Sequence, residues 1–304
     1  MPTTVSALTI LRGREAHLLN VIRGLEQQSR KPDEFVIGVM DDAPIAVLPT
    51  ASFPIRQVLI PGDPLPLAKA RNTVAREANG EILIFLDVDC IPAPKLIGEY
   101  VDALEDWDGM LMGEVMYLPS GANAPGWTYE GFDAVAERHS DRQGPPPQGI
   151  RPCNDYRCFW SLNFALPAEV FALSGGFDEA YSGYGGEDTD YGRVLEERNI
   201  AIGWLKGGKV YHQYHPHHMP PVHHIDSILR NTCVFKDKWG EYTMGHWLRA
   251  FEMMGLVEKA EYGWTKLREP DESDRALTMQ QAHMPYANSA RVIRALEARQ
   301  VAAE

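Results

Sequence analysis

The sequence predicts an α/β fold in which a mostly parallel central sheet is flanked by helices and followed by a helical C-terminal extension. Short apolar runs alternate with amphipathic helical patterns over residues 5–86, which is typical of doubly wound sheets. One of these runs, ILIFL, is continuously apolar, as expected for a strand buried on both faces. From residue 222 onward the pattern is mostly helical. We therefore expect two units, residues 1–221 and residues 222–304.

The first half contains six predicted elements, and turn or helix-stop signals end two of them. Pro61-Gly62 ends one strand, and Asn79-Gly80 ends a helix. The elements are, in order, strand Val5–Leu11, helix 14–28, strands 34–40 and 55–60, helix 67–78 and strand 81–86.

The second half is less regular. Residues 119–152 are rich in Gly and Pro and predict a long irregular excursion. After it we expect a strand over 159–166, a helix over 187–198, a strand or hairpin over 200–211, and an exposed helix or frayed tail over 289–303.

Composition restricts the possible partners. The net charge is −13, from 42 acidic and 29 basic residues, which disfavours binding to nucleic acid and electrostatic adhesion to anionic lipid.

The first residues lack the pattern of a signal peptide, and no apolar stretch has the length of a transmembrane segment. We expect a cytoplasmic protein with reduced cysteines, and the absence of a CxxC pair gives a zinc site little support.

Acidic residues follow several predicted strands. Asp41 and Asp42 follow strand 34–40, and Asp87 and Asp89 follow the apolar strand. In parallel α/β sheets the ligand crevice lies beyond the carboxyl ends of the strands. Two carboxylates separated by one residue on an extended backbone point the same way and can face one metal and its phosphate ligands. The alternative is a pair of solvated loop aspartates.

Two sequence blocks resemble a known family. Residues 68–72 (AKARN) and 80–89 (GEILIFLDVD) resemble a conserved stretch of family 2 glycosyltransferases, which have the GT-A fold. Residues 175–179 (GGFDE) and 185–190 (GGEDTD) resemble their second signature. The second block also resembles the corresponding regions of β-1,4-galactosyltransferases and polypeptide N-acetylgalactosaminyltransferases. The resemblance covers roughly residues 5–215.

The resemblance implies a metal-dependent, inverting glycosyltransferase. Such an enzyme moves a sugar from a nucleotide-diphosphate donor, with UDP favoured, to the hydroxyl of a glycan or other acceptor. The alternatives are a retaining transferase on the same fold, a sugar nucleotidyltransferase, and a carbohydrate-binding pseudoenzyme. The C-terminal extension matches no signature, and acceptor binding, a homo-oligomer or docking at a membrane edge are all compatible with it.

Carried over by position, the resemblance assigns the donor side of the site. The first strand of the family ends in Pro-Thr-Tyr-Asn, whereas this chain has Leu-Arg-Gly-Arg over 11–14. A carboxylate after the second strand suits the N3–H donor of uracil, and a cation near the diphosphate would offset its charge. For the arginine of AKARN, a salt bridge to a strand-end aspartate is the competing interpretation. The implied donor-site residues are Leu11, Arg12, Asp42, Arg71, Asp87 and Val88.

The same comparison implies a metal site. Asp89 would bind Mn²⁺ or Mg²⁺ together with a histidine after the last strand of the sheet. His212 is the first choice because it directly follows a predicted strand, and His215 is the second. The surrounding histidine run could alternatively bind zinc.

The second block supplies the acceptor side. By resemblance, Asp188 is the general base that takes the proton of the acceptor hydroxyl, and Glu187 holds acceptor or sugar hydroxyls. Gly186 allows close approach of the backbone to a sugar, and Tyr184 holds the place of an acceptor-stacking aromatic. The competing interpretation is that both acids simply stabilise a helix N-terminus.

Overall fold

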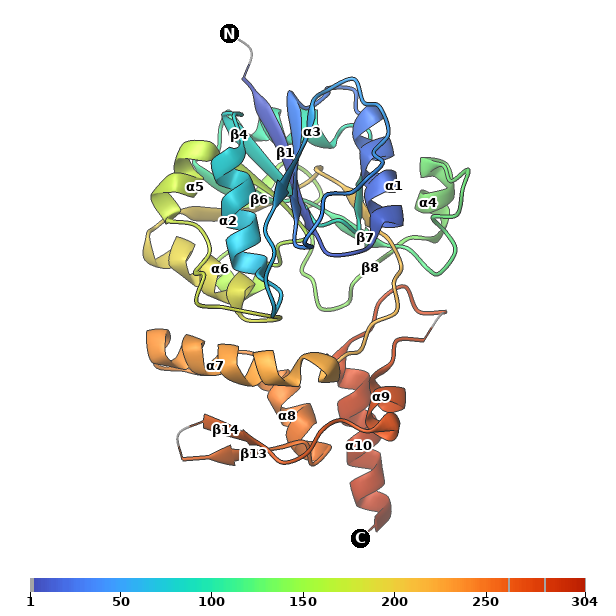
Figure 1. Ribbon diagram of the computed structural model, residues 1–304, viewed down its shortest axis with the longest axis vertical. Helices are drawn as coiled ribbons and strands as arrows, with labels where there is room; N and C mark the ends of the chain where they lie inside the picture. Colours follow the sequence, from blue (N-terminus) through green and yellow to red (C-terminus); the bar gives the residue numbers. More distant parts are fainter. Residues whose placement is uncertain (1–2, 262, 282, 304) are drawn as a thin grey trace.

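In the computed structural model, which describes residues 3–261, 263–281 and 283–303, the chain forms an α/β part followed by a smaller, mostly helical part (Figure 1). The N-terminus and C-terminus lie at opposite ends of the long axis. None of the helices within those ranges is long and apolar enough to cross a membrane.

An eight-stranded sheet forms the centre of the α/β part. Four strands pair in parallel at one side, and the next strand, β10, runs antiparallel between β4 and β6. The predicted, mostly parallel sheet is therefore confirmed, with antiparallel pairings at β10 and at the edge strand β9. The strand order is β3 (Ile55–Leu59), β2 (Glu34–Val39), β1 (Val5–Leu11), β4 (Ile82–Leu86), β10 (Asn163–Pro167), β6 (Gly109–Met112), β11 (Ala201–Leu205) and β9 (Ile150–Pro152).

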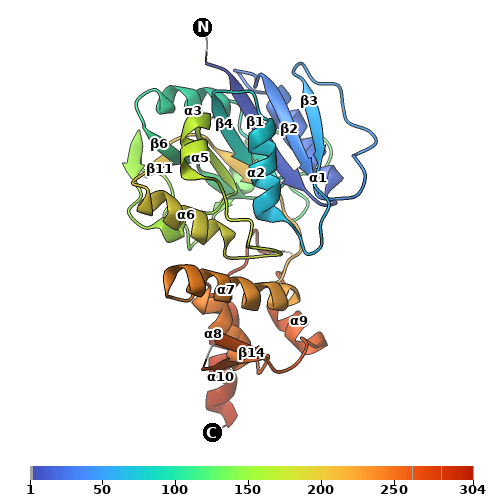
Figure 2. The ribbon, with the colours of Figure 1, turned by 60° about the vertical axis from the view of Figure 1, so that its left-hand side comes forward.

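Helices cover both faces of this sheet (Figure 2). The buried side chains of α1 (Glu15–Glu26) and α3 (Leu96–Leu104) share one apolar core with the strands. Those of α2 (Leu67–Glu77), α5 (Ala168–Ser174) and α6 (Glu187–Glu197) share the other. Because β4 lies between the two cores, all five of its residues are buried, as its continuous apolar sequence predicts.

A second, four-stranded sheet lies at the carboxyl end of β4. Its order is β5 (Cys90–Pro92), β12 (Val210–His212), β7 (Val115–Tyr117) and β8 (Glu137–Arg138). Residues 200–211 therefore do not form one strand or a hairpin as considered above, because β11 and β12 belong to different sheets. Pairing of β12 with β5 places His212 opposite Cys90.

The segments around the second sheet differ in detail from the sequence prediction. The irregular excursion 119–152 contains α4 (Tyr129–Val135), β8 and β9. The strand predicted over 159–166 begins only at Asn163, because the 3₁₀ turn η1 (Tyr156–Cys158) and a turn precede it. The side chain of Asp155 accepts from the amide of Arg157 and favours this turn.

The C-terminal part has its own apolar core, which includes Ile228, Phe251 and Val292. Most of it is helical, but residues 257–266 include a β-hairpin that the helical prediction did not include. Its elements are η2 (Val222–His224), α7 (Ile225–Trp239), α8 (Gly245–Met253), β13 (Val257–Ala260), β14 (Gly263–Lys266), α9 (Glu272–Thr278) and α10 (Ser289–Ala303). In Figures 1 and 2, α7 lies along the α/β part, next to α6.

Candidate active site

The acidic pair after β4 lies at the junction of the two sheets. The main-chain amide of Asp87 donates to the carbonyl of Leu162 at 2.9 Å, and the amide of Cys90 donates to the carbonyl of Asp87 at 2.8 Å. These bonds turn the chain from β4 into β5. The side chain of Asp89 is only 3% exposed, whereas Asp87 is half-buried.

Asp89, His212 and His215 form one cluster. One ligand atom from each lies within 4.8 Å of the others. Burial lowers the pKa of His212 to about 3, so its imidazole is neutral at physiological pH, which is the form that binds metals. The ring of Tyr117 stacks on that of His212 at a centroid distance of 4.7 Å.

Two buried atoms of this cluster lack hydrogen-bond partners within the described residues, namely Oδ1 of Asp89 and Nδ1 of His212. Buried polar atoms normally have partners. A carboxylate with two imidazoles suits a divalent cation such as Mn²⁺. The donor set and the unsatisfied atoms therefore fit the metal expected from the sequence.

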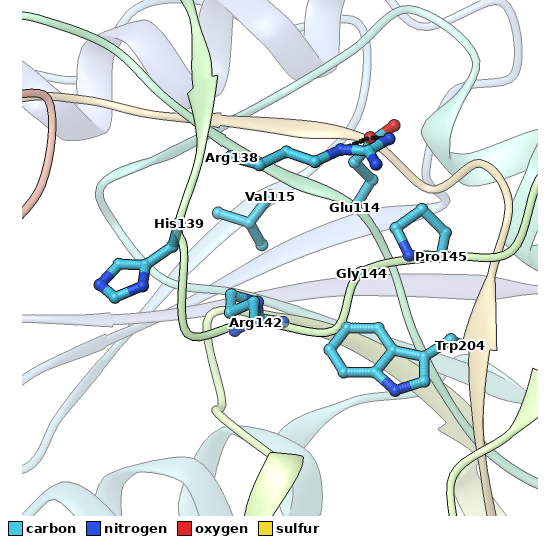
Figure 3. A pocket seen from close by; sticks show the side chains of 8 residues that line it. All are labelled: Glu114, Val115, Arg138, His139, Arg142, Gly144, Pro145 and Trp204. Atoms are coloured by element: carbon cyan, nitrogen blue, oxygen red, sulfur yellow. Dashed lines mark hydrogen bonds and ion pairs between the residues drawn. The ribbon is translucent and has the colours of Figure 1, made fainter.

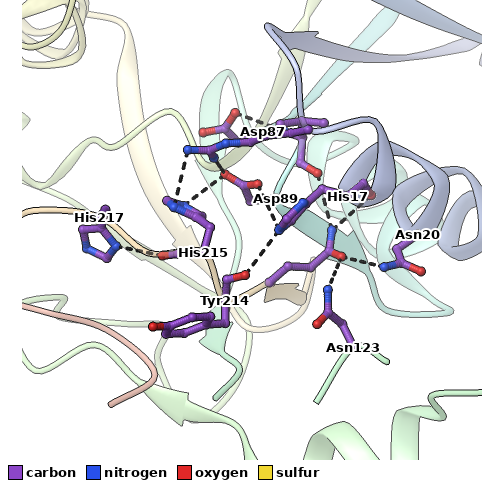
Figure 4. Close-up of polar contacts among 11 residues, drawn as sticks. His17, Asn20, Asp87, Asp89, Asn123, Tyr214, His215 and His217 are labelled. Carbon is purple, nitrogen blue, oxygen red and sulfur yellow. Dashed lines mark hydrogen bonds and ion pairs between the residues drawn. The ribbon is translucent and has the colours of Figure 1, made fainter. Parts of the chain in front are cut away.

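Two side chains of the first helix region also approach Asp89 (Figure 4). The guanidinium of Arg14 pairs with Oδ2 of Asp89 and lies 3.4 Å from Nδ1 of His215. Nε2 of His17 lies 3.9 Å from Oδ1 of Asp89. Burial raises the pKa of Asp89, but the hydrogen bond from His215 and the charge of Arg14 outweigh burial and hold it low. The carboxylate therefore stays ionised.

Gln213 connects this cluster to its surroundings. It is fully buried; its Nε2 donates to the carbonyl of His17 at 3.1 Å, and its Oε1 accepts from Asn20 and Asn123 at 2.7 and 2.9 Å. Sequence reasoning missed both His17 and Gln213. Only their positions in the sequence could have indicated them. His17 lies one helical turn after Arg14, and Gln213 directly follows His212.

The second acidic pair lies at the N-terminus of α6. Gly186 precedes this helix without a side-chain cap, and Glu187 and Asp188 occupy the first turn. Oδ2 of Asp188 accepts a 2.9 Å hydrogen bond from the amide of Ser161. Its Oδ1 is buried and has no hydrogen-bond partner within the described part of the chain.

Arg71 lies between the two acidic pairs. Its guanidinium is 3.3 Å from Oε1 of Glu187 and 3.8 Å from Oδ1 of Asp188. Burial lowers the pKa of Arg71, but the charges of Asp188, Glu187 and Asp87 outweigh it and raise the pKa. Arg71 therefore forms an ion pair, which was the alternative to a donor-binding role. The carboxylates nearest to Arg71 belong to α6, however, and not to a strand end.

Arg71 connects the two acidic pairs, because it pairs with Glu187 and also lines a hollow together with Asp87. Arg71, Asp87 and Ser161 line one small hollow. Burial and the neighbouring Asp89 raise the pKa of Asp87 to about 6. Burial and the neighbouring Asp188 raise the pKa of Glu187 to about 7. Crowding of carboxylates that raises their pKa values is characteristic of functional sites.

The remaining residues predicted for the donor side lie at or just after the ends of β1, β2 and β4. Arg12 donates to the carbonyl of Met40 at 3.0 and 2.7 Å and also to the carbonyl of Gly62, so it holds three chain segments together. Leu11 and Val88 are buried. Asp42 is exposed, whereas its neighbour Asp41 accepts from the amide of Gly13 at 3.1 Å.

Tyr184, predicted for the acceptor side, contacts the C-terminal part. The ring of Tyr184 stacks on that of His224, with centroids 4.8 Å apart, and lies 5.9 Å from that of Trp247. Gly186 has a φ of +94°, and a Cβ there would lie 3.0 Å from the ring of Tyr181. Both the backbone conformation and the close packing therefore require glycine at this position.

A separate hollow beside β7 and β8 contains none of the predicted site residues (Figure 3). Arg138 there pairs with Glu114. The guanidinium of Arg142 lies 5.1 and 5.2 Å from the ring centroids of Trp160 and Trp204, a cation–π arrangement.

The fold and the site define a glycosyltransferase with the GT-A fold. Residues 6–160 match the glycosyl transferase family 2 model, and residues 148–218 match the model described as the N-terminal domain of galactosyltransferase. The chain belongs to glycosyl transferase family 2.

Among curated proteins, the chain is similar to validoxylamine A glucosyltransferase of Streptomyces hygroscopicus subsp. limoneus. The two are 26% identical over 224 residues, which is 62% of this chain and 47% of the relative. It is also 28% identical over 174 residues to chondroitin synthase of Pasteurella multocida (strain Pm70), covering 49% of this chain and 18% of the relative. The chain thus spans less than half the length of these relatives.

Solved structures share the fold. The structure of GalNAc-T7 with UDP, GalNAc and Mn²⁺ has a TM-score of 0.51 at 15% identity, covering 70% of this chain and 44% of that chain. The structure of S. aureus TarS has a TM-score of 0.52 at 11% identity, covering 82% of this chain and 43% of that chain.

Proposed function

We propose that the protein transfers a sugar from a nucleotide-diphosphate donor to an acceptor hydroxyl, with inversion at the anomeric carbon. The observation that carries this proposal is the presence of two different acidic sites that Arg71 connects. Asp89 with two histidines suits a cation and diphosphate. Asp188, held by Ser161 through one oxygen, suits proton abstraction by the other.

On the donor side, Asp89, His212 and His215 would hold Mn²⁺ or Mg²⁺. When bound, such an ion stabilises the negative charge that develops on the departing diphosphate. Asp87, two residues before Asp89, would contact the ribose or the water shell of the ion. Leu11, Arg12, Asp42 and Val88 would line the nucleotide position at the carboxyl ends of the strands, where ligands bind in open α/β sheets.

On the acceptor side, Asp188 would act as the general base. The acceptor oxygen forms a bond to the anomeric carbon while its proton passes to Oδ1 of Asp188. The bond between that carbon and the diphosphate oxygen breaks, and its electron pair leaves with the nucleotide. The guanidinium of Arg71 lies 3.8 Å from Oδ1. Glu187, Gly186 and Tyr184 would contact the acceptor.

UDP is the nucleotide we propose first. GalNAc-T7 was crystallised with UDP, and TarS with UDP-GlcNAc, and both share the fold of this chain. A thermal-shift panel of UDP, GDP and UDP-sugars, each with and without Mn²⁺, tests this assignment. A rise in Tm that requires Mn²⁺ is expected for the correct donor, because that ligand binds only the folded state. No response to any nucleotide would contradict the proposal and favour a pseudoenzyme.

The stereochemistry of the product tests inversion. NMR of the product gives the anomeric configuration of the transferred sugar. Inversion requires a configuration opposite to that of the donor. Retention would leave the glycosyltransferase assignment in place but would remove the role of Asp188 as the base.

A further inference from the structure

One face of α7 binds the main chain of the loop that leads into Glu187 and Asp188. Asn231 is fully buried on α7. Its Nδ2 donates to the carbonyl of Gly185 at 2.8 Å, and its Oδ1 accepts from the amide of Ser182 at 3.3 Å. Ser227, one turn earlier, accepts from the amide of Tyr184 at 3.2 Å through its Oγ.

This loop has little local support of its own. Gly183, Gly185 and Gly186 have φ values of +80°, +94° and +94°, a region that costs conformational entropy to fix. The helix that follows has no side-chain N-cap, so the usual local contact that fixes a helix start is absent. Contacts from outside the loop must therefore select its conformation.

The C-terminal helices fit closely against the glycines. A Cβ on Gly183 would lie 2.4 Å from Cβ of Ser227, and one on Gly185 would lie 2.8 Å from Sδ of Met244 and 3.2 Å from Cζ3 of Trp247. The C-terminal part thus packs directly on the backbone just before the two acids.

A second group of contacts joins the far end of α7 to α6. Asp190 is fully buried and accepts from Nζ of Lys238 at 2.9 Å and from Nε1 of Trp239 at 2.7 Å. It lies two residues after Asp188 in the same helical turn. Side chains of α7 therefore bind the chain on both sides of the acidic pair.

We propose that α7 is an integral part of the active site, and that Asn231 is a positioning residue which sets the loop 182–186 and thereby the orientation of Asp188. Both family matches end by residue 218, before α7 begins at Ile225. The catalytic consequence rests on the proposed function, whereas the positioning itself does not.

The test compares Asn231→Ala with Thr232→Ala in the full chain. Thr232 is the next residue of α7, is equally buried, and donates to the carbonyl of Thr243 at 3.0 Å, away from the loop. We expect amide hydrogen exchange over 182–188 to accelerate at least tenfold in Asn231→Ala and less than twofold in Thr232→Ala. Ser227→Ala should accelerate hydrogen exchange of the same amides, and it replaces Asn231→Ala as the test variant if Asn231→Ala does not fold.

Unchanged exchange over 182–188 in Asn231→Ala and Ser227→Ala would overturn the proposal. Equal acceleration in Thr232→Ala would also overturn it, because α7 would then act only through general stability. In kinetics, we expect kcat of Asn231→Ala to fall at least tenfold with the donor Kd within twofold of wild type. A weakened donor Kd at normal kcat would contradict the role assigned to Asn231. A wild-type protein with no transferase activity would refute the proposed function but would leave the exchange result decisive for positioning.

Discussion

The amide of Ser161 and the carboxylate of Asp188 are joined by a 2.9 Å hydrogen bond to Oδ2. The donor is a main-chain group on the segment between η1 and β10, so the fold itself orients the carboxylate. Oδ1 is left without a hydrogen-bond partner among the described residues. One oxygen is thus held while the other can accept a proton.

Substitution of Asp188 by Asn should remove proton abstraction and preserve shape. We expect kcat to fall about 10²–10⁴-fold, the usual contribution of a positioned base, with the donor Kd within about threefold of wild type. Steady-state kinetics and donor titration measure the two quantities. Lost donor affinity at normal turnover would show that Asp188 belongs to the donor site.

Substitution of His212 by Ala should weaken metal binding. The side chain supplies one of three clustered ligand atoms, so we expect the Kd for Mn²⁺ to rise at least tenfold in calorimetric titration and the Mn²⁺-dependent rise in Tm to disappear. His223→Ala is the control, since His223 belongs to the same histidine run but lies outside this cluster. Equal weakening in both variants would argue against the assigned ligand set.

Glu187 should make stability depend on pH. Burial and Asp188 raise its pKa from the ordinary 4.5 to about 7, so between these values the native state binds more protons than the unfolded state. The free energy of unfolding therefore decreases as pH rises through this window. Relative to Glu187→Gln, wild type should lose on the order of 1–3 kcal/mol between pH 4.5 and 7.5. Urea unfolding of both proteins across this range measures the difference, and a relative gain by wild type would contradict the assignment.

Gly183 and Gly240 allow conformational strain to be separated from packing. Both have a φ of +80°, but a Cβ on Gly183 would meet Cβ of Ser227 at 2.4 Å, whereas one on Gly240 would meet nothing within 4 Å. Gly240→Ala should cost about 1 kcal/mol for its backbone conformation. Gly183→Ala should cost a further 1–3 kcal/mol, roughly the price of overpacking, and should lower kcat. Equal losses of stability would mean that α7 moves freely away from the loop.

The sequence predicted the parts of the fold that depend on local pattern. The continuous apolar run gave a strand buried on both faces, and the alternation of strands with helices gave the mostly parallel sheet. The pairing of strands that are far apart in the sequence could not be predicted from local pattern. The two strands of residues 200–211 belong to different sheets, and nothing in their own residues specifies their partners. The short hairpin 257–266 was hidden within a helical pattern for the same reason.

The candidate site shows a similar division. Asp89, His212 and His215 stand in recognisable motifs, and the structure brings them together. His17 and Gln213 acquire their roles only through the fold, because each contacts residues far away in the sequence. The contribution of α7 could not be predicted either. Asn231 binds a main-chain carbonyl and a main-chain amide, and main-chain groups leave no sequence signature.

The pairing of Arg14 with Asp89 has a consequence for how the protein matures. A buried carboxylate without a counter-charge is strongly destabilising, yet here an arginine from the start of α1 already supplies one. That side chain is 41% exposed. Folding therefore does not require the proposed cation, because Arg14 already compensates Asp89. A cation bound at Asp89 would replace this ion pair rather than enter an uncompensated site.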